Sequence, residues 1–205
     1  MGRYKSTNPP PQGFQQPSMP QQQTYGNPQQ QGGFPQAQAQ NQYNPNDWPQ
    51  TFTGPVIGAD RDGVILEWKN VIKRYEDVRY IPGSLDAIRS LRLKGHRFVI
   101  FSDQPNIERG LITGEQVGNI MNNMMQTFGQ SGIFSIDGFY FNQTSNPQDA
   151  YAKPNIGMLN RATQESGVNW KTGYYVGDTI DDIKMAQKAG ATPVLVRTGK
   201  GAETE

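Results

Sequence analysis

The chain of 205 residues contains no cysteine and a single histidine, His96. These two shortages exclude disulfide bridges, thiolate zinc sites, a cysteine nucleophile and any multi-histidine metal site. The sequence also lacks a run of about 18 apolar residues and a basic-then-apolar N-terminus, so neither a membrane span nor a secretory signal is predicted. We therefore expect a soluble, cytoplasmic protein in which carboxylates and hydroxyls carry most of the chemistry.

The chain also lacks an excess of charge of one sign, because it contains 19 Lys and Arg residues and 18 Asp and Glu residues. The strongly basic field of a dedicated nucleic-acid binder is therefore missing.

Residues 1–50 contain no Ile, Leu or Val, although they hold 9 of the 15 prolines and 14 glutamines. Such a segment cannot bury enough apolar surface to offset the entropy lost on ordering. We predict a disordered arm over residues 1–53 and one domain over residues 54–205, a usual size for a single core. The arm is either a solvated linker or a segment that binds a protein partner through its spaced aromatic residues. Those aromatics are Tyr4, Phe14, Tyr25, Phe34, Tyr43 and Trp48.

Short β-rich runs alternate with amphipathic stretches from Val56 onward. The alternation predicts an α/β fold with a mostly parallel sheet, because parallel neighbours need crossover connections. Ligands bind at the carboxyl ends of the strands in such sheets. The predicted strands are 56–59, 97–101, 139–141, 173–176 and 193–196. The predicted helices are 85–91, 117–128 behind a Thr113–Gln116 capping box, 156–162 and 183–186.

Polar residues stand at the ends of three predicted strands and before one helix. They are Asp60-Arg61-Asp62-Gly63, Ser102-Asp103-Gln104, Lys153-Pro154 and Gly177-Asp178, with Asp182 four residues after Asp178. Each has an ordinary interpretation as a turn, a helix cap, a surface lysine or a complement to a helix dipole. A calcium loop is excluded, because Val64, Leu66 and Val71 occupy ligand positions. Taken together, the residues place carboxylates, a hydroxyl and an ammonium around one crevice, as metal-assisted phosphoryl transfer through an aspartyl phosphate requires.

This constellation resembles the haloacid dehalogenase (HAD) superfamily of phosphatases over nearly the whole predicted domain. Further motifs are similar to those of the heptose-bisphosphate phosphatase and histidinol-phosphatase branch. They are Asp60–Gly63, Gln104 with Ile107 and Arg109-Gly110, Lys153-Pro154 with Gly157–Leu159, Val176–Asp178 and Val194–Lys200. The resemblance implies a Rossmann-like, three-layer core without a large cap.

The resemblance also implies roles for individual residues. Asp60 is then the nucleophile and Asp62 the general acid and base. Ser102 and Lys153 hold the phosphoryl oxygens, and the substrate-binding loop continues into Asp103 and Gln104.

A magnesium ion is implied by the same resemblance. Its ligands are the Asp60 carboxylate, the Asp62 backbone carbonyl and Asp178, with Asp182 in a supporting role. An oxygen-only ligand set suits this hard ion.

The sequence departs from this branch at several positions. Residues 142–152, where relatives carry a zinc loop of three Cys and one His, contain neither residue type, so zinc is not expected. Asp103 stands where the family has Asn, Pro105-Asn106 where it has Ser-Gly, and Ala152 where it has Arg. An added carboxylate beside a phosphate pocket weakens anion binding unless it is paired or turned away.

Three functions follow as hypotheses. The first is a magnesium-dependent phosphomonoesterase acting on a small phosphorylated metabolite such as a sugar phosphate or bisphosphate. The second is a nucleic-acid 3′-phosphatase, which a basic groove with stacking aromatics favours; the candidate residues are Arg89, Arg92, Lys94, Arg97, Trp68 and Trp170. The third is a non-catalytic structural or interaction protein that uses its arm, against which the presence of both Asp60 and Asp62 argues.

Overall fold

The computed structural model describes residues 44–205, and residues 1–43 of the predicted arm lie outside the described residues. Five strands form one sheet in the order β3-β2-β1-β4-β5, and every pairing is parallel. The strands are β1 (Gly54–Asp60), β2 (His96–Asp103), β3 (Gly138–Asn142), β4 (Tyr174–Gly177) and β5 (Thr192–Leu195). The α/β fold predicted from the alternation is confirmed, and each strand overlaps its predicted range.

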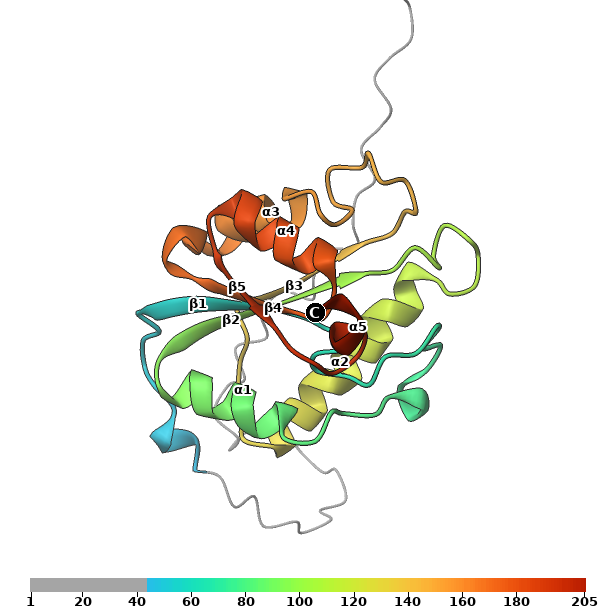
Figure 1. Cartoon of the computed structure of the whole chain (residues 1–205). Coiled ribbons are helices and arrows are strands. Elements are labelled where there is room, and N and C mark those ends of the chain that lie inside the picture. Colours follow the sequence, from blue (N-terminus) through green and yellow to red (C-terminus); the bar gives the residue numbers. More distant parts are fainter. Residues whose placement is uncertain (1–43) are drawn as a thin grey trace, which may run out of the picture. The chain divides into compact units, whose positions relative to one another are not determined.

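Helices cover both faces of the sheet and give the three-layer arrangement (Figure 1). On one face lie α1 (Ser84–Leu93) and α2 (Gly114–Gln130), and on the other lie α3 (Gly157–Ser166) and α4 (Ile180–Ala189). A short α5 (Gly201–Thr204) follows β5. The 3-10 turns are η1 (Pro45–Asp47), η2 (Tyr75–Asp77) and η3 (Trp170–Thr172). Across residues 44–205 we find no helix with the length and apolarity to cross a bilayer.

Two apolar layers hold the sheet between the helices. The predicted stripe of α2 is buried against one face through Val117, Ile120, Met121, Met124 and Phe128. Its predicted capping box is present, since Thr113 Oγ1 accepts a hydrogen bond from the Gln116 N–H (3.1 Å) and Gln116 Oε1 accepts one from the Thr113 N–H (2.8 Å). The second layer, on the side of α3 and α4, centres on Phe101, Tyr175 and Trp170.

Two aromatic residues that precede the predicted domain start at residue 54 pack on the domain. The Trp48 ring lies edge-on to Phe134 with centroids 5.2 Å apart, and the Arg92 guanidinium lies 3.7 Å from the centroid of Phe52. Arg92 is 1% exposed and pairs with Asp137 at 2.5 Å. Contacts with the domain therefore extend toward the N-terminus as far as Trp48.

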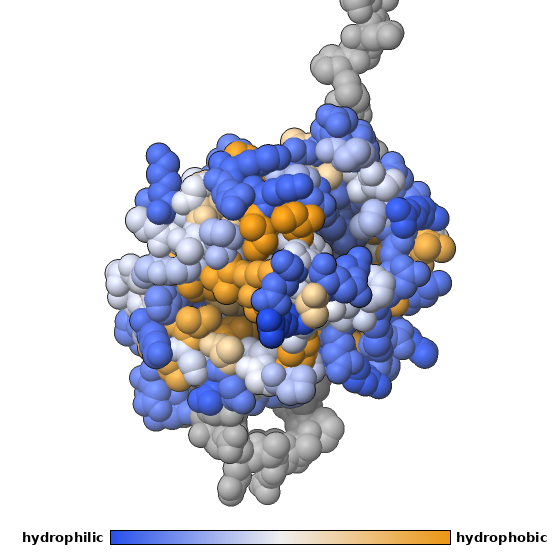
Figure 2. Space-filling model, viewed as in Figure 1, coloured by the Kyte–Doolittle hydropathy of each residue, from blue (hydrophilic) through white to orange (hydrophobic). Residues whose placement is uncertain are grey.

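The sheet is less covered at its β5 edge, on the side of α1 and α2. Tyr174 and Val194 share this side through the register that pairs Val176 with Val194, and they are 42% and 37% exposed. Figure 2 shows apolar surface near the centre of the molecule, over the region where Figure 1 places β4 and β5.

Candidate active site

The carboxyl ends of the strands meet at one edge because the sheet is parallel throughout. Strand β1 ends at Asp60, β2 ends at Asp103, and Asp178 follows β4 directly. A cavity of about 320 Å³ lies at this edge. Of the predicted site residues, all but Ser102 line it: Asp60, Asp62, Asp103, Gln104, Lys153, Asp178 and Asp182.

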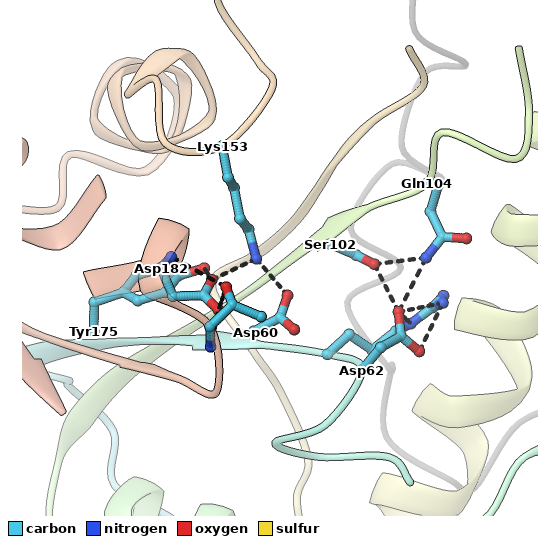
Figure 3. Close-up of polar contacts among 9 residues, drawn as sticks. Asp60, Asp62, Ser102, Gln104, Lys153, Tyr175 and Asp182 are labelled. Carbon is cyan, nitrogen blue, oxygen red and sulfur yellow. Dashed lines mark hydrogen bonds and ion pairs between the residues drawn. The ribbon is translucent and has the colours of Figure 1, made fainter. Parts of the chain in front are cut away.

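Lys153 lies between two buried carboxylates (Figure 3). Its Nζ is 2.5 Å from Asp60 Oδ1 and 2.8 Å from Asp182 Oδ1. The side chains of Lys153, Asp60 and Asp182 are 5%, 9% and 1% exposed. The hydroxyl of Tyr175, which is fully buried, donates to Asp182 Oδ1 over 3.4 Å. The ammonium thus offsets part of the negative charge in a site that water barely reaches.

Burial and charge shift the pKa values of this cluster in opposite directions. Burial raises the pKa of Asp60 well above its usual range, and the Lys153 charge opposes the rise. Burial alone lowers the pKa of Lys153, but the charges of Asp182 and Asp60 outweigh it and raise that pKa, so the amine stays protonated. Burial also acts to raise the pKa of Asp182, yet Lys153 and Thr179 hold it below its usual range.

The start of α4 brings Asp182 to the site. Thr179 is the N-cap residue, and its Oγ1 accepts from the Asp182 N–H (3.3 Å) while Asp182 Oδ2 accepts from the Thr179 N–H (3.1 Å). This capping box was not predicted, although Thr followed three residues later by an acidic side chain is a sequence signal for it. The cap fixes the Asp182 carboxylate, whose Oδ1 then faces Lys153.

Two glycines allow the chain to pass close to Asp178. Gly63 and Gly199 have φ values of 98° and 58°. A Cβ at either position would lie about 2 Å from Asp178 Oδ2, at 2.2 Å and 2.1 Å respectively. Both turns therefore require glycine, and they enclose the Asp178 carboxylate.

The carboxylates fit a hard divalent cation. Oxygen atoms of Asp60, Asp178 and Asp182 lie within 4.8 Å of one another, and all three residues are buried. Asp178 Oδ2 accepts from the Lys200 N–H at 2.8 Å, whereas the buried Oδ1 has no hydrogen-bond partner among the described residues. An unsatisfied buried carboxylate oxygen beside two further carboxylates is a donor set suited to Mg²⁺. Burial raises the pKa of Asp178 in the absence of such a cation.

Asp62 belongs to a second hydrogen-bond cluster, apart from Lys153 (Figure 3). Its Oδ2 accepts from Ser102 Oγ at 3.0 Å and from Gln104 Nε2 at 3.0 Å. Gln104 Nε2 also donates to Ser102 Oγ at 2.8 Å. The sequence analysis assigned Ser102 and Gln104 to substrate binding. In this structure both side chains donate hydrogen bonds to Asp62.

Arg61 is a site residue that the sequence analysis did not assign. It is 1% exposed, and its Nε and Nη2 both donate to Asp62 Oδ2, at 3.0 Å and 2.8 Å. A buried guanidinium needs a carboxylate partner, and the adjacent position of Asp62 was the signal available in the sequence. Five hydrogen bonds in total hold the Asp62 carboxylate in place.

Asp103 lines the cavity near Lys153. Burial raises its pKa, and the Lys153 charge and the Asn142 amide oppose the rise. The extra carboxylate expected from the sequence therefore belongs to a residue that lines the site.

Of the six residues considered for nucleic-acid binding, Trp68 lines this cavity, and the other five are not among its lining residues. Arg97 stands at the start of β2, at the opposite end of the strand from Ser102, and pairs with Asp137 at 2.9 Å. Arg92 is buried in the same ion-pair group, and Trp170 is 5% exposed. Of the residues proposed for a basic groove with stacking aromatics, only Trp68 therefore stands at the site.

A parallel α/β sheet with buried carboxylates and a lysine at its carboxyl edge defines a class of phosphoryl-transfer enzymes. Comparisons with known proteins narrow the class. A family model described as HAD-hydrolase-like matches residues 150–205. The D-glycero-beta-D-manno-heptose-1,7-bisphosphate 7-phosphatase of Yersinia pestis is 33% identical over 165 residues, which cover 76% of this chain and 87% of the relative. The enzyme of the same name from Escherichia coli K12 is 31% identical over 156 residues, 71% of this chain and 81% of the relative.

A solved structure agrees. The D,D-heptose 1,7-bisphosphate phosphatase of B. bronchiseptica, complexed with magnesium and phosphate, gives a TM-score of 0.69 at 29% identity, over 73% of this chain and 84% of that one. The chain belongs to the HAD-like phosphatases, which confirms the family resemblance found in the sequence.

Proposed function

We propose that this HAD-like phosphatase is a magnesium-dependent phosphomonoesterase that works through an aspartyl phosphate on a small sugar phosphate or sugar bisphosphate. The observation that carries the proposal is the buried group of Asp60, Asp178 and Asp182 around the Lys153 ammonium at the carboxyl edge of the sheet. The substrate class comes from the relatives, which are named as heptose-1,7-bisphosphate 7-phosphatases.

In the first step the Asp60 carboxylate attacks phosphorus and the bond from phosphorus to the ester oxygen breaks. Asp62 gives its proton to the departing alkoxide, which leaves as an alcohol. Asp60 then carries the phosphoryl group, and Asp62 is a carboxylate.

In the second step the Asp62 carboxylate takes a proton from a water molecule whose oxygen attacks phosphorus. The bond between phosphorus and the Asp60 oxygen breaks, which releases inorganic phosphate and restores the Asp60 carboxylate. The proton on Asp62 readies it for the next turnover.

Lys153 and Ser102 hold the phosphoryl oxygens in this scheme. The Lys153 ammonium stabilises the charge that develops on the equatorial oxygens, and the Ser102 hydroxyl donates to one of them. Ser102 must then exchange its present acceptor, Asp62 Oδ2, for the phosphoryl group. That exchange also frees Asp62 from one of the donors that hold it.

Mg²⁺ would be held by the Asp60 carboxylate, the Asp62 backbone carbonyl and Asp178, with Asp182 in support. Bound there, it supplies positive charge that lets the anionic Asp60 and the anionic phosphoryl group approach. Asp182 keeps Lys153 charged and in place, which its ion pair at 2.8 Å supports. The two-part organisation is part of the proposal: an N-terminal arm, either a linker or a segment that binds a protein partner, precedes a phosphatase domain whose contacts extend back to Trp48.

The test is phosphate release with and without Mg²⁺, from wild type and from Asp60→Asn. The substrate panel contains heptose 1,7-bisphosphate, histidinol phosphate, other sugar phosphates and a 3′-phosphorylated oligonucleotide. We expect Mg²⁺-dependent release from a sugar phosphate that Asp60→Asn abolishes. The proposal is contradicted if Asp60→Asn still releases phosphate, or if folded wild type releases none from any substrate in the panel.

A further inference from the structure

One wall of the active-site cavity carries a large apolar side chain that the catalytic steps do not use. Trp68 lines the cavity and is 47% exposed, the largest exposure among the three tryptophans, all of which the structure describes. Trp170 is 5% exposed and Trp48 packs on the core. An indole that lines a reaction site and is open to water can pack against a ligand, and burial of its apolar surface then gains free energy.

The Trp68 ring is held in place by its neighbours. The Lys200 ammonium lies 4.7 Å from the ring centroid, and the Lys200 N–H donates to Asp178 Oδ2 at 2.8 Å. The indole is therefore linked to the segment that encloses the candidate metal ligand.

The loop that bears Trp68 is fixed from two further directions. The Lys69 ammonium donates to the Asp77 carbonyl at 2.5 Å, and the Asn106 side-chain amide donates to the Asn70 carbonyl at 2.7 Å. Residues 68–72 all line the cavity, so this loop forms a wall with a set position. Because the loop that bears Trp68 is already fixed, a ligand ring can pack on the indole with little further loss of conformational entropy.

The cavity lining combines buried and exposed side chains. Asp60, Lys153 and Asp178 are nearly enclosed by protein. Trp68, Lys200 and Arg109 line the same cavity and are exposed. Among the described lining residues Trp68 is the one aromatic side chain, so it is the group available to pack against the leaving group of an ester bound at Asp60.

We infer that Trp68 is a specificity-determining residue that stacks on the apolar face of a sugar ring in the leaving group. The inference rests on the proposed phosphatase function and narrows its substrates from phosphate monoesters in general to ring-bearing ones. An indole can pack against the face of C–H groups that a sugar ring presents, and an acyclic polyol phosphate has no such fixed face to cover.

The kinetic test compares substrates with matched leaving groups. Glucose 6-phosphate and glycerol 3-phosphate are both primary alkyl phosphates, and only the first carries a ring. Heptose 1,7-bisphosphate is a second ring-bearing substrate. We expect Trp68→Ala to lower kcat/KM about tenfold for ring-bearing substrates, mainly through KM, and less than about twofold for glycerol 3-phosphate. Trp68→Phe keeps most of the activity. Leu93→Ala removes an exposed apolar side chain in α1, and we expect it to leave kcat/KM unchanged for ring-bearing substrates and for glycerol 3-phosphate.

A binding test does not depend on turnover. In Asp60→Asn with Mg²⁺, glucose 6-phosphate is expected to quench tryptophan fluorescence, and the added Trp68→Phe change removes the quenching. Glycerol 3-phosphate quenches weakly in either protein. Circular dichroism of each variant reports whether the fold is kept.

The outcomes separate the two proposals. If Trp68→Ala lowers kcat/KM equally for ring-bearing and acyclic substrates, or for neither, the role of Trp68 is overturned while the phosphatase function stands. If wild type releases phosphate from no substrate, the phosphatase function fails, and the role of Trp68 is decided by the quenching. Quenching that persists after Trp68→Phe overturns the role of Trp68 in that case too.

Discussion

The side-chain amide of Gln104 donates a hydrogen bond to the carboxylate of Asp62, with 3.0 Å between Nε2 and Oδ2. The same Nε2 lies 2.8 Å from Ser102 Oγ, and Gln104 is 8% exposed. One buried amide therefore orients both the proposed acid–base residue and the proposed phosphate ligand. We predict that Gln104→Leu lowers kcat about tenfold with a smaller change in KM, because the variant leaves Asp62 and Ser102 without a shared donor.

The control for this prediction is Gln148→Leu, at an exposed position, which leaves kcat unchanged. Steady-state kinetics at saturating Mg²⁺ separate kcat from KM. A Gln104→Leu enzyme with wild-type kcat and a raised KM would show that Gln104 binds substrate, as the sequence-based interpretation had it.

Asp103 gives a prediction on pH. Burial raises its pKa in the folded state above that of the unfolded chain. The folded state therefore binds more protons between those two values, and the free energy of unfolding falls as pH rises through the folded-state pKa. Asp103→Asn removes this loss, so its stability advantage over wild type is absent below the unfolded-state pKa of Asp103 and grows as pH rises through the raised folded-state pKa. Urea unfolding at a series of pH values measures the difference.

The same variant tests anion binding. Removing one negative charge from the cavity is expected to lower the inhibition constant of inorganic phosphate about fivefold at pH 7.5, from roughly 1 kcal/mol of repulsion. Asp149→Asn, in the loop that follows β3, is the charge-matched control. A wild-type inhibition constant in Asp103→Asn would mean that the Asp103 carboxylate faces away from the bound anion.

The buried ion pair of Arg92 and Asp137 gives a prediction on stability. Arg92 Nη1 donates to Asp137 Oδ2 at 2.5 Å and Nη2 donates to Ser135 Oγ at 2.9 Å. Arg92→Met leaves Asp137 short of a partner in a buried setting and should cost about 3 to 5 kcal/mol of unfolding free energy. Arg74→Met removes an exposed pair with Asp77 and should cost less than about 1 kcal/mol. Equal costs for the two variants contradict this account.

The sequence was sufficient for the fold because its signals are local. Apolar runs located all five strands, and the period of Val117 to Phe128 located the buried face of α2. The strand-end rule then placed Asp60, Asp103 and Asp178 at one edge of the sheet. These inferences need only the spacing of residue types along the chain.

Side-chain partners are set by three-dimensional packing, and the sequence did not predict them. Ser102 and Gln104 donate to Asp62 across 40 and 42 positions, and Lys153 reaches Asp60 across 93. The position of the Trp68 loop depends on contacts with Lys200 and Asn106, which no local pattern encodes. The packing of Trp48 was missed because the composition of its surroundings resembles the arm.

The carboxylate group predicts a stabilising response to Mg²⁺. Asp178 Oδ1 is buried without a hydrogen-bond partner within residues 44–205, and burial raises the pKa of this carboxyl. The ionised carboxylate is therefore unfavourable in the metal-free protein, and a cation relieves that cost. At 100 times its dissociation constant, Mg²⁺ should add about 2.7 kcal/mol to the free energy of unfolding. That corresponds to a rise in Tm of about 5 to 10 °C in a domain of this size.

The response should depend on Asp178 and on pH. Asp178→Asn removes a charged ligand and should lose most of the rise in Tm, while Asp181→Asn, the neighbouring acid outside the carboxylate group, keeps it. Because Mg²⁺ binds the ionised carboxylate, the rise shrinks as pH falls through the raised pKa of Asp178. Differential scanning calorimetry with Mg²⁺ and with EDTA measures each case. Equal rises in both variants would mean that the cation binds away from Asp178.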